Sequence, residues 1–448
     1  MGVDYSIIGA VLIGVVILLF LILKLRLPAF ISLLISSILV GLLSGLDGNT
    51  IIDTIQTGMA STLGFVATVV GLGALFGGIL ELSGGAKVIA QSLLKRFGEN
   101  NSGFSLGLTG FLVAIPVFFD VAFIILVPVI YAIQNKTGKS LLHYAIPLLS
   151  GLAITHSFIP PTPGPIAVAD IIGADLGWVM LVGFLAGVPT LIVSGVLFGK
   201  FIGNKIHITA PELTDQVDTN NRALPSFSTV IAIIALPIIL IMFATLSKSG
   251  IISIQSEKAN DIIGLIGHPF IALILANLLA WFLLGKRQGY SSKELLDISS
   301  KSFKPAGIII LLTGAGGVFK QTLVATKAGE MMANGLSEMG MPVIIFAFLA
   351  AALVRVLQGS ATVAMITAAG LVSPLIVNAS YSPIELAALV IAIASGASIF
   401  SHVNDSGFWL VKEYLGLTEK QTFNSWTMMT TLLALVGFSV SLIVFTIA

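Results

Sequence analysis

The amino-acid sequence predicts an all-α, polytopic integral membrane protein. It also predicts two repeats of inverted topology, each with a re-entrant helical hairpin and a broken transmembrane helix. Of the 448 residues, 56% are hydrophobic and only 10% are charged, whereas a soluble domain carries about 25% charged residues. Apolar runs of the roughly 20 residues that a bilayer crossing needs recur along the chain. Motifs of the first half return in the second half.

Matching motifs make the repeat visible. Pro28–Ile31 (PAFI) opens one apolar run, and His268–Ile271 (HPFI) opens another. Further along each half, Thr155-His156 in the first half matches Ser401-His402 in the second. Because the two matches have nearly the same offset, they indicate one duplicated unit.

The charges of equivalent loops indicate that the two copies are inverted. Residues 44–58 include two acidic residues and no lysine or arginine, whereas residues 285–304 include five basic residues and two acidic ones. Loops rich in lysine and arginine stay in the cytoplasm, so these loops are expected on opposite sides. Lys24 and Arg26 follow the first apolar run, which predicts an extracytoplasmic N-terminus. Many secondary transporters use such an inverted repeat to open one site to either face.

The composition excludes several classes of protein. The shortage of charge excludes a soluble enzyme, and the continuous apolar runs exclude an outer-membrane barrel, whose strands alternate in polarity. The net charge of +1 is uninformative about nucleic acid, but no basic stripe is present to bind it. The chain has no cysteine, and its five histidines show no metal-binding spacing, so we expect no metal and no other cofactor. The segment Ile7–Leu23 lacks a basic n-region and is interpreted as a retained first helix.

Apolar length and punctuation predict the elements in order. Asn204–Ser226 is the one long polar segment, and it is interpreted as a linker (204–226) between a first repeat, 1–203, and a second repeat, 227–448. Residues 104–133 and 342–378 contain breaks that suit helical hairpins. Crossings are predicted near 6–23, 28–46, 58–82, 141–175 (broken), 177–199, 228–247, 268–285, 305–320, 384–420 (broken) and 425–447.

Four interruptions of the apolar runs carry the polar chemistry. Irregular backbone at membrane depth either lines a cavity or is buried in protein. The first interruption contains Pro116, which removes a backbone donor, and Asp120, which has apolar neighbours on both sides. A carboxylate there costs free energy unless it is paired or protonated. Asp120 is therefore either a proton-binding group or a structural cap at the hairpin tip.

The second interruption is His156–Pro165, with four prolines in its last six residues. Proline cannot continue a helix, so we expect a discontinuous helix whose second half begins near Gly164. Free N–H groups and the helix dipole at that point favour an anion. A surface loop between two helices is the alternative, and His156 could be a purely structural histidine.

The third and fourth interruptions lie in the second half. Arg355 precedes a Gly-Ser break with hydroxyls at Ser360 and Thr362. Its guanidinium stays charged and could bind a substrate carboxylate, or it could pair with Asp120 or Asp405 as a structural group. The fourth interruption suits a polyol, or else begins a cytoplasmic loop; its polar residues include Ser401, His402, Asn404 and Asp405.

At these interruptions the chain resembles the gluconate permease family of proton symporters, within the broader ion-transporter superfamily. The matching stretches are Pro116–Ala122 (PVFFDVA), Thr155–Pro165 (THSFIPPTPGP), Gly359–Ala364 (GSATVA) and Ser401–Gly407 (SHVNDSG). The resemblance implies uptake of D-gluconate or a related sugar acid, driven by protons, across the bacterial inner membrane. It also implies a homodimer whose scaffold holds the interface while a mobile transport domain carries the site, as in an elevator. One branch of relatives carries D-serine, and no residue separates these substrates.

The predicted site follows from these residues. We expect Asp120 to carry the coupling proton, with Asp405 and the two histidines as the next candidates. The expected partners are a small anionic sugar acid, membrane lipid and a second copy of the chain. The alternatives are a sodium-coupled carboxylate transporter, an ion channel and, ranked last, a membrane enzyme. The predicted substrate-binding residues are His156, Thr162, Gly164, Arg355, Ser360, Thr362, Ser401, His402 and Asn404.

Overall fold

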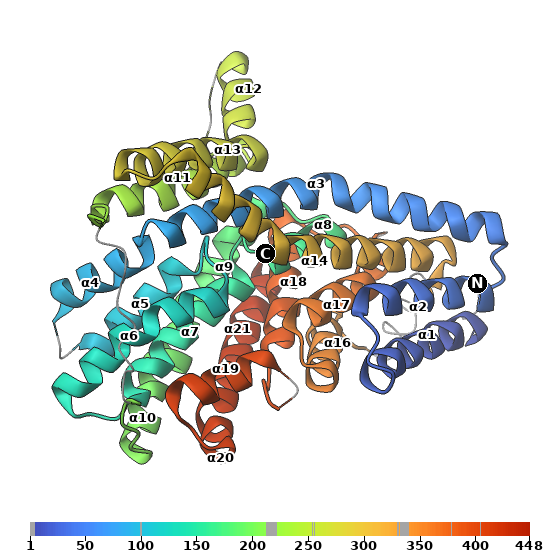
Figure 1. The fold of residues 1–448 in the computed structure, drawn as a ribbon. Helices are drawn as coiled ribbons and strands as arrows, with labels where there is room; N and C mark the ends of the chain where they lie inside the picture. Colours follow the sequence, from blue (N-terminus) through green and yellow to red (C-terminus); the bar gives the residue numbers. More distant parts are fainter. Residues whose placement is uncertain are drawn as a thin grey trace.

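The computed structural model describes residues 5–98, 101–211, 222–252, 254, 256–328, 331, 340–377, 379–403 and 405–448. Within these ranges every regular element is a helix, as the sequence predicts. Eight of the described helices are long and apolar enough to cross a membrane. Figure 1 shows the helices packed into one elongated body, with α3 and α14 running side by side along its length.

The first half of the chain begins with a pair of helices and a long third helix. Asp47 caps the third helix, since its carboxylate accepts from the backbone N–H of Asn49 at 3.0 Å and of Thr50 at 3.1 Å. The elements of this half are α1 (Tyr5–Leu23), α2 (Ala29–Leu43), α3 (Gly48–Leu82), α4 (Gly85–Phe97), α5 (Ser102–Val113), α6 (Phe119–Thr137), α7 (Leu142–Phe158), α8 (Pro163–Ile172), α9 (Leu176–Thr190), the π-helical segment η2 (Leu191–Leu197) and α10 (Phe198–Lys205).

The second half follows the same order: a long helix after shorter ones, a hairpin, a broken helix and a final helix. Its elements are α11 (Phe227–Lys248), α12 (Glu257–Ile266), α13 (Pro269–Ala280), η3 (Trp281–Gly285), η4 (Lys286–Gln288), α14 (Ser292–Ala325), α16 (Val343–Gln358), α17 (Ala361–Ile376), α18 (Pro383–Ser398), α19 (Ser406–Leu415), α20 (Glu419–Thr422), η5 (Phe423–Thr427) and α21 (Met428–Ile447). The inverted orientation of the two halves in the membrane, and the boundaries 1–203, 204–226 and 227–448, remain predictions.

The two hairpins and the two broken helices are present. Helices α5 and α6 are joined through residues 114–118, and α16 and α17 through Gly359 and Ser360. Gly359 has a φ of +89°, which glycine adopts without the strain of a Cβ. Helix α7 stops at the prolines and restarts as α8, and α18 restarts as α19 after residue 405. Proline and glycine therefore account for both hairpin tips and for the break between α7 and α8, whereas the break between α18 and α19 contains neither residue.

The long helices extend beyond their predicted limits. Helix α3 begins at Gly48 and α14 at Ser292, ahead of the apolar cores predicted at 58–82 and 305–320. Capping explains the difference, because Ser291 and Glu294 form a capping box that stabilises a polar first turn. The short amphipathic helices α4 and α12 were also missing from the prediction, since neither is long enough to cross a membrane.

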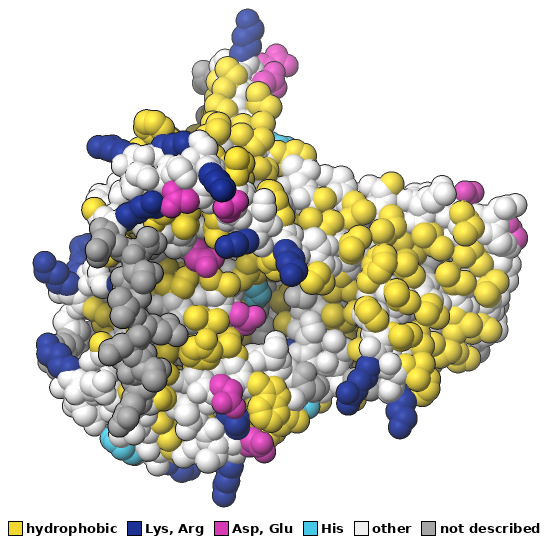
Figure 2. All heavy atoms as spheres, viewed as in Figure 1, with side chains coloured by type: hydrophobic (Ala, Val, Ile, Leu, Met, Phe, Trp, Pro, Cys, Tyr) yellow, Lys and Arg dark blue, Asp and Glu magenta, His cyan; other side chains and the backbone are white. Residues whose placement is uncertain are grey.

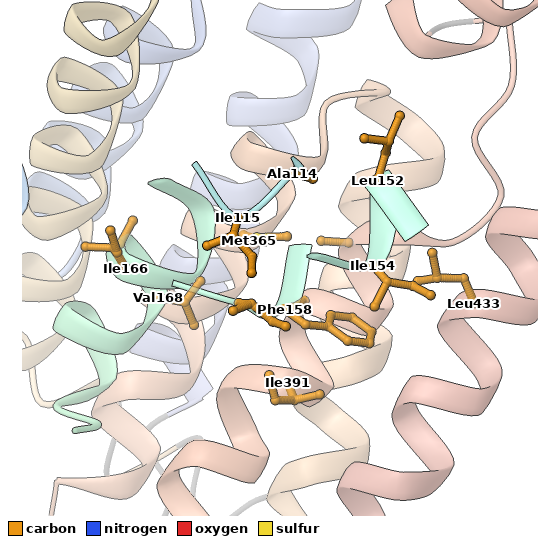
Figure 3. Packing of buried hydrophobic residues seen from close by; sticks show 14 of the residues in the cluster. Ala114, Ile115, Leu152, Ile154, Phe158, Ile166, Val168, Met365, Ile391 and Leu433 are labelled. Carbon is orange, nitrogen blue, oxygen red and sulfur yellow. The ribbon is translucent and has the colours of Figure 1, made fainter. Parts of the chain in front are cut away.

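Two groups of helices meet in the middle of the molecule. One group contains α1, α2, α3, α13 and α14, and the other contains the hairpins, the broken helices and the final helices. Helices α3 and α14 cross so closely that a Cβ on Gly58 would lie 2.6 Å from the Cα of Val318. In the second group, apolar side chains of α7, α8, α17, α18 and α21 gather around the fully buried Phe158 (Figure 3).

Candidate functional site

A cavity of about 570 Å³ collects side chains from all four interruptions. Asp120 comes from the tip of the first hairpin, His156 from the end of α7, Arg355 from α16 and Asp405 from the start of α19. Figure 2 shows a hollow in the centre of one face, with acidic and histidine side chains visible between apolar surfaces. Residues that are far apart in the sequence therefore face one common space.

Arg355 and Asp405 form an ion pair at this cavity. Their side chains are only 6% and 13% exposed. Arg355 also donates to the carbonyl of Gly359, and Asp405 accepts from the hydroxyl of Ser401 and, at 3.1 Å, from the backbone N–H of Gly407. The buried Nε of Arg355 has no hydrogen-bond partner in the described structure. Of the two carboxylates considered as partners of Arg355, the structure selects Asp405.

Asp120 lies in the first turn of α6 and is exposed to the cavity. Within the described part of the chain, its carboxylate has no hydrogen bond and no ion pair. The N-cap of α6 is Phe118, which offers no side-chain acceptor. Asp120 is therefore the carboxylate of this cavity whose charge no neighbouring side chain balances directly.

The tip of the second hairpin presents backbone donors. The side-chain oxygen of Gln358 accepts from the N–H of Ser360 at 2.7 Å, and the Ser360 hydroxyl accepts from the N–H of Val363 at 3.3 Å. The N–H groups of Ala361 and Thr362 precede the first intrahelical bond of α17, and both residues line the cavity. Together with the helix dipole, these groups make the start of α17 favourable for an anion.

His156 and a pair of serines line the opposite part of the cavity. Ser398 of α18 donates to the hydroxyl of Ser157 at 3.0 Å, which connects the two broken helices. The ring of His156 lies against Phe118, with 6.3 Å between the ring centroids. Its Nδ1 is buried and has no partner among the described residues. The cavity thus contains hydroxyl, imidazole, carboxylate and guanidinium groups within one small volume.

Comparison with known proteins identifies the family. A family model described as GntP family permease matches residues 6–447. The chain belongs to the GntP family of permeases. The low-affinity gluconate transporter of Escherichia coli K12 is 41% identical to this permease over 432 residues, covering 96% of each chain. The gluconate permease of Pseudomonas aeruginosa is 38% identical, covering 95% of this chain and 94% of that one.

A solved structure supports the architecture. The YdaH transporter of Alcanivorax borkumensis matches the permease with a TM-score of 0.63, covering 90% of this chain and 89% of that one. The identity of 16% limits this comparison to the fold. With the family and the apolar helices, it confirms an all-helical membrane protein. The permease is a multi-pass, non-enzymatic transport protein.

Four of the predicted site residues do not line the cavity. Thr162 is buried, and its hydroxyl donates to the carbonyl of Ile159 at 2.6 Å. Gly164 packs against α17, where a Cβ would lie 2.7 Å from the sulfur of Met365. Ser401 contacts Asp405 and accepts from the Trp426 indole N–H at 2.6 Å, and a ring nitrogen of His402 lies 2.9 Å from the Val356 carbonyl oxygen. Asn404 lies outside the described residues.

Several residues that line the cavity were not predicted. Phe118 and Phe119 stand beside Asp120, and Gln358 stands beside Gly359, so their positions next to the interruptions were an available signal. Trp426, whose ring centroid lies 5.5 Å from that of Phe119, gave no such signal because it lies in η5, outside the four interruptions. The other polar lining residues that were not predicted as site residues are Ser157, Ser398, Ser406 and Thr430.

Proposed function

We propose that this permease takes up D-gluconate, or a closely related sugar acid, together with protons across the bacterial inner membrane. The observation that carries the proposal is the common cavity of the four interruptions, together with the gluconate transport of its named relatives. A sugar acid has one carboxylate and a chain of hydroxyls, and the cavity offers groups for both.

The carboxylate end of the substrate is placed near the start of α17. The free N–H groups of Ala361 and Thr362, at the positive end of the α17 dipole, supply positive potential there, and Arg355 is close enough to the hairpin tip to hydrogen-bond the Gly359 carbonyl. Hydroxyls of the substrate would exchange hydrogen bonds with Ser157, Ser360 and His156. The rings of the aromatic residues Phe118, Phe119 and Trp426 provide an apolar wall for the carbon chain.

Charge balance in the cavity supports proton coupling through Asp120. Among the described residues that line it, the acidic and basic side chains other than histidine are Asp120, Arg355 and Asp405. Arg355 and Asp405 neutralise each other, so an ionised Asp120 would repel an incoming carboxylate. A proton on Asp120 removes that repulsion. Binding of the proton and of the anion therefore favour each other, which is the reciprocity that symport requires.

The architecture supports alternating access of the elevator type. The cavity lies mainly in the group that contains the hairpins and broken helices, while α3 and α14 belong to the other group. A movement of the first group against the second would carry the site across the membrane. In the proposed arrangement the chain forms a homodimer through the second group, and its N-terminus is extracytoplasmic, as Lys24 and Arg26 indicate.

Uptake into proteoliposomes tests the function. Labelled D-gluconate is added to sodium-free vesicles that carry an imposed inward proton gradient, with a protonophore and D-serine in parallel samples. We expect accumulation that the protonophore abolishes and that D-serine leaves unchanged. Competition by D-serine would instead indicate the D-serine branch. Accumulation that needs sodium in place of choline would indicate a sodium-coupled carboxylate transporter.

A further inference from the structure

Lys320 is a charged residue inside an apolar part of α14. It is the only charged residue between Lys304 and Lys327 in the sequence. A lysine at such a position is costly in a membrane unless its ammonium group finds partners within the protein. Lys320 does not line the cavity, and the proposed transport chemistry makes no use of it.

The partner of Lys320 is the tail of half-helix α8. Its Nζ donates to the carbonyl of Ile171 at 2.6 Å, and the hydroxyl of Ser373 on α17 donates to the same oxygen at 2.8 Å. The last carbonyls of a helix have no intrahelical donor, and a cation near them also complements the helix dipole. The carboxylate of Asp170 adds electrostatic attraction to Lys320. Lys320 thus caps a helix that belongs to the other half of the chain.

The surrounding packing leaves little freedom at this point. A Cβ on Gly316, one turn before Lys320, would lie 2.1 Å from a methyl carbon of Ile366 on α17. A Cβ on Gly370 would lie 3.2 Å from the ring of Phe319. Helices α8, α14 and α17 therefore meet in close contact, and the acceptor of the ammonium group among the described residues is the Ile171 carbonyl.

The contact joins the two groups of helices. Helix α14 packs with α3 in one group. Helix α8 belongs to the other group: its C-terminal end contacts Lys320, and Thr162 at its N-terminal end lies close to His156, which lines the cavity. Alternating access, on which this inference rests, moves these groups against each other. Because an ammonium group cannot remain without partners at membrane depth, Lys320 must either keep the Ile171 carbonyl or exchange it for another acceptor. The Lys320 contact is therefore either made with Ile171 or made with a different acceptor, with no stable arrangement between the two.

We propose that Lys320 is a positioning residue for transport, which clamps the tail of α8 to α14 and thereby holds the arrangement of the cavity described here. Removing the ammonium group releases α8 and shifts the chain toward its other conformations. The first observable consequence is a change in the side from which the cavity is accessible.

Site-directed labelling tests this proposal without any substrate. Because the chain has no native cysteine, Ala153→Cys places a single thiol in the cavity. A membrane-impermeant maleimide is applied to right-side-out and to inside-out vesicles, and the ratio of the two labelling rates is measured. We expect Lys320→Met to change this ratio at least about tenfold, since a hydrogen bond from a charged group is lost. Lys320→Arg should restore most of the original ratio.

Lys304→Met is the matched control, because Lys304 is an exposed lysine on the same helix. It should leave the ratio unchanged. An unchanged ratio in a folded Lys320→Met protein would overturn the proposal.

If Lys320→Met does not fold, Ser373→Ala provides the test. This variant removes the second donor to the Ile171 carbonyl and should shift the labelling ratio about threefold in the same direction. No shift in Ser373→Ala would then overturn it. Absence of gluconate uptake would leave these labelling results intact and would refute only the proposed substrate.

Discussion

Arg355 of α16 and Asp405 at the start of α19 form a buried ion pair that ties the second hairpin to the second broken helix. The pair also organises its neighbours, since Asp405 caps α19 and holds Ser401 while Arg355 holds the Gly359 carbonyl at the hairpin tip. One interaction therefore positions two sides of the cavity. It also determines that Asp405 is engaged while Asp120 is not.

Breaking this pair should destabilise the protein strongly. Arg355→Met leaves the Asp405 carboxylate buried without its cation, which costs about 3–5 kcal/mol. Arg355→Lys should cost less, because it retains the charge and loses the planar fork. Thermal unfolding in detergent measures both. The control is the pair Lys412–Glu413, whose carboxylate partner is 70% exposed, and Lys412→Met should cost no more than about 1 kcal/mol. Equal costs for Arg355→Met and Lys412→Met would contradict the prediction.

Replacing the unpaired carboxylate should uncouple transport. Asp120→Asn keeps the size and polarity of the side chain but cannot take up or release a proton. We expect the variant to lose proton-driven accumulation of gluconate while it retains exchange of labelled for unlabelled substrate. Asp297→Asn, an exposed position on α14, should leave both activities unchanged. Unimpaired accumulation by Asp120→Asn would remove Asp120 from the coupling role.

The contact between α3 and the first hairpin should tolerate no side chain. A Cβ on Gly77 would lie 2.0 Å from the backbone carbonyl oxygen of Pro116, which cannot move without displacing the hairpin tip. We expect Gly77→Ala to lower the free energy of unfolding by about 1–3 kcal/mol. Gly71→Ala lies on the same helix with nothing within 4 Å of the added carbon, so it should be neutral or slightly stabilising. The melting temperatures of Gly77→Ala and Gly71→Ala, each compared with that of the unchanged protein, test this prediction.

The N-cap of α3 should contribute stability in a pH-dependent way. Hydrogen bonds from the side chain and backbone of Thr50 hold the pKa of Asp47 below its usual value of 3.8. A lowered pKa stabilises the folded state above the unfolded pKa, and this contribution is lost as the pH falls through the folded value. Asp47→Ala should therefore melt at a lower temperature at neutral pH but not at pH values below the folded pKa. Asp53→Ala, an exposed acid of the same helix, should show no such difference.

Three of the four interruptions were predictable because they are local properties of the backbone. Pro116, the prolines after Ile159 and Gly359 either remove a backbone donor or favour φ values that a helix does not use. Their positions identified both hairpins and the first broken helix, whereas the second broken helix was identified from the polar residues of Ser401–Gly407 and from their match to the first half. The amphipathic helix α4 was missed, because a short helix with a polar face has no length signal of a crossing.

The site was predictable only in part. One cavity is lined by Asp120, His156, Arg355, Ser360, Thr362 and Asp405, whereas Thr162, Gly164, Ser401 and His402 are not among its lining residues. Every one of these residues stands at or beside an interruption, so proximity to a break could not distinguish a lining residue from a supporting one. Which of them bind substrate stays a prediction that the transport assays address.

By itself the sequence determined that this chain is an apolar, multi-helical membrane protein with four interrupted segments, because hydropathy and backbone constraints act over a few neighbouring residues. Only the tertiary structure decided that Arg355 pairs with Asp405, that Asp120 has no such partner among the residues that the structure describes, and that Lys320 caps α8. These relationships join residues from different helices and from both halves. Their free energies depend on distances that exist only after the helices have packed, so no local pattern could encode them.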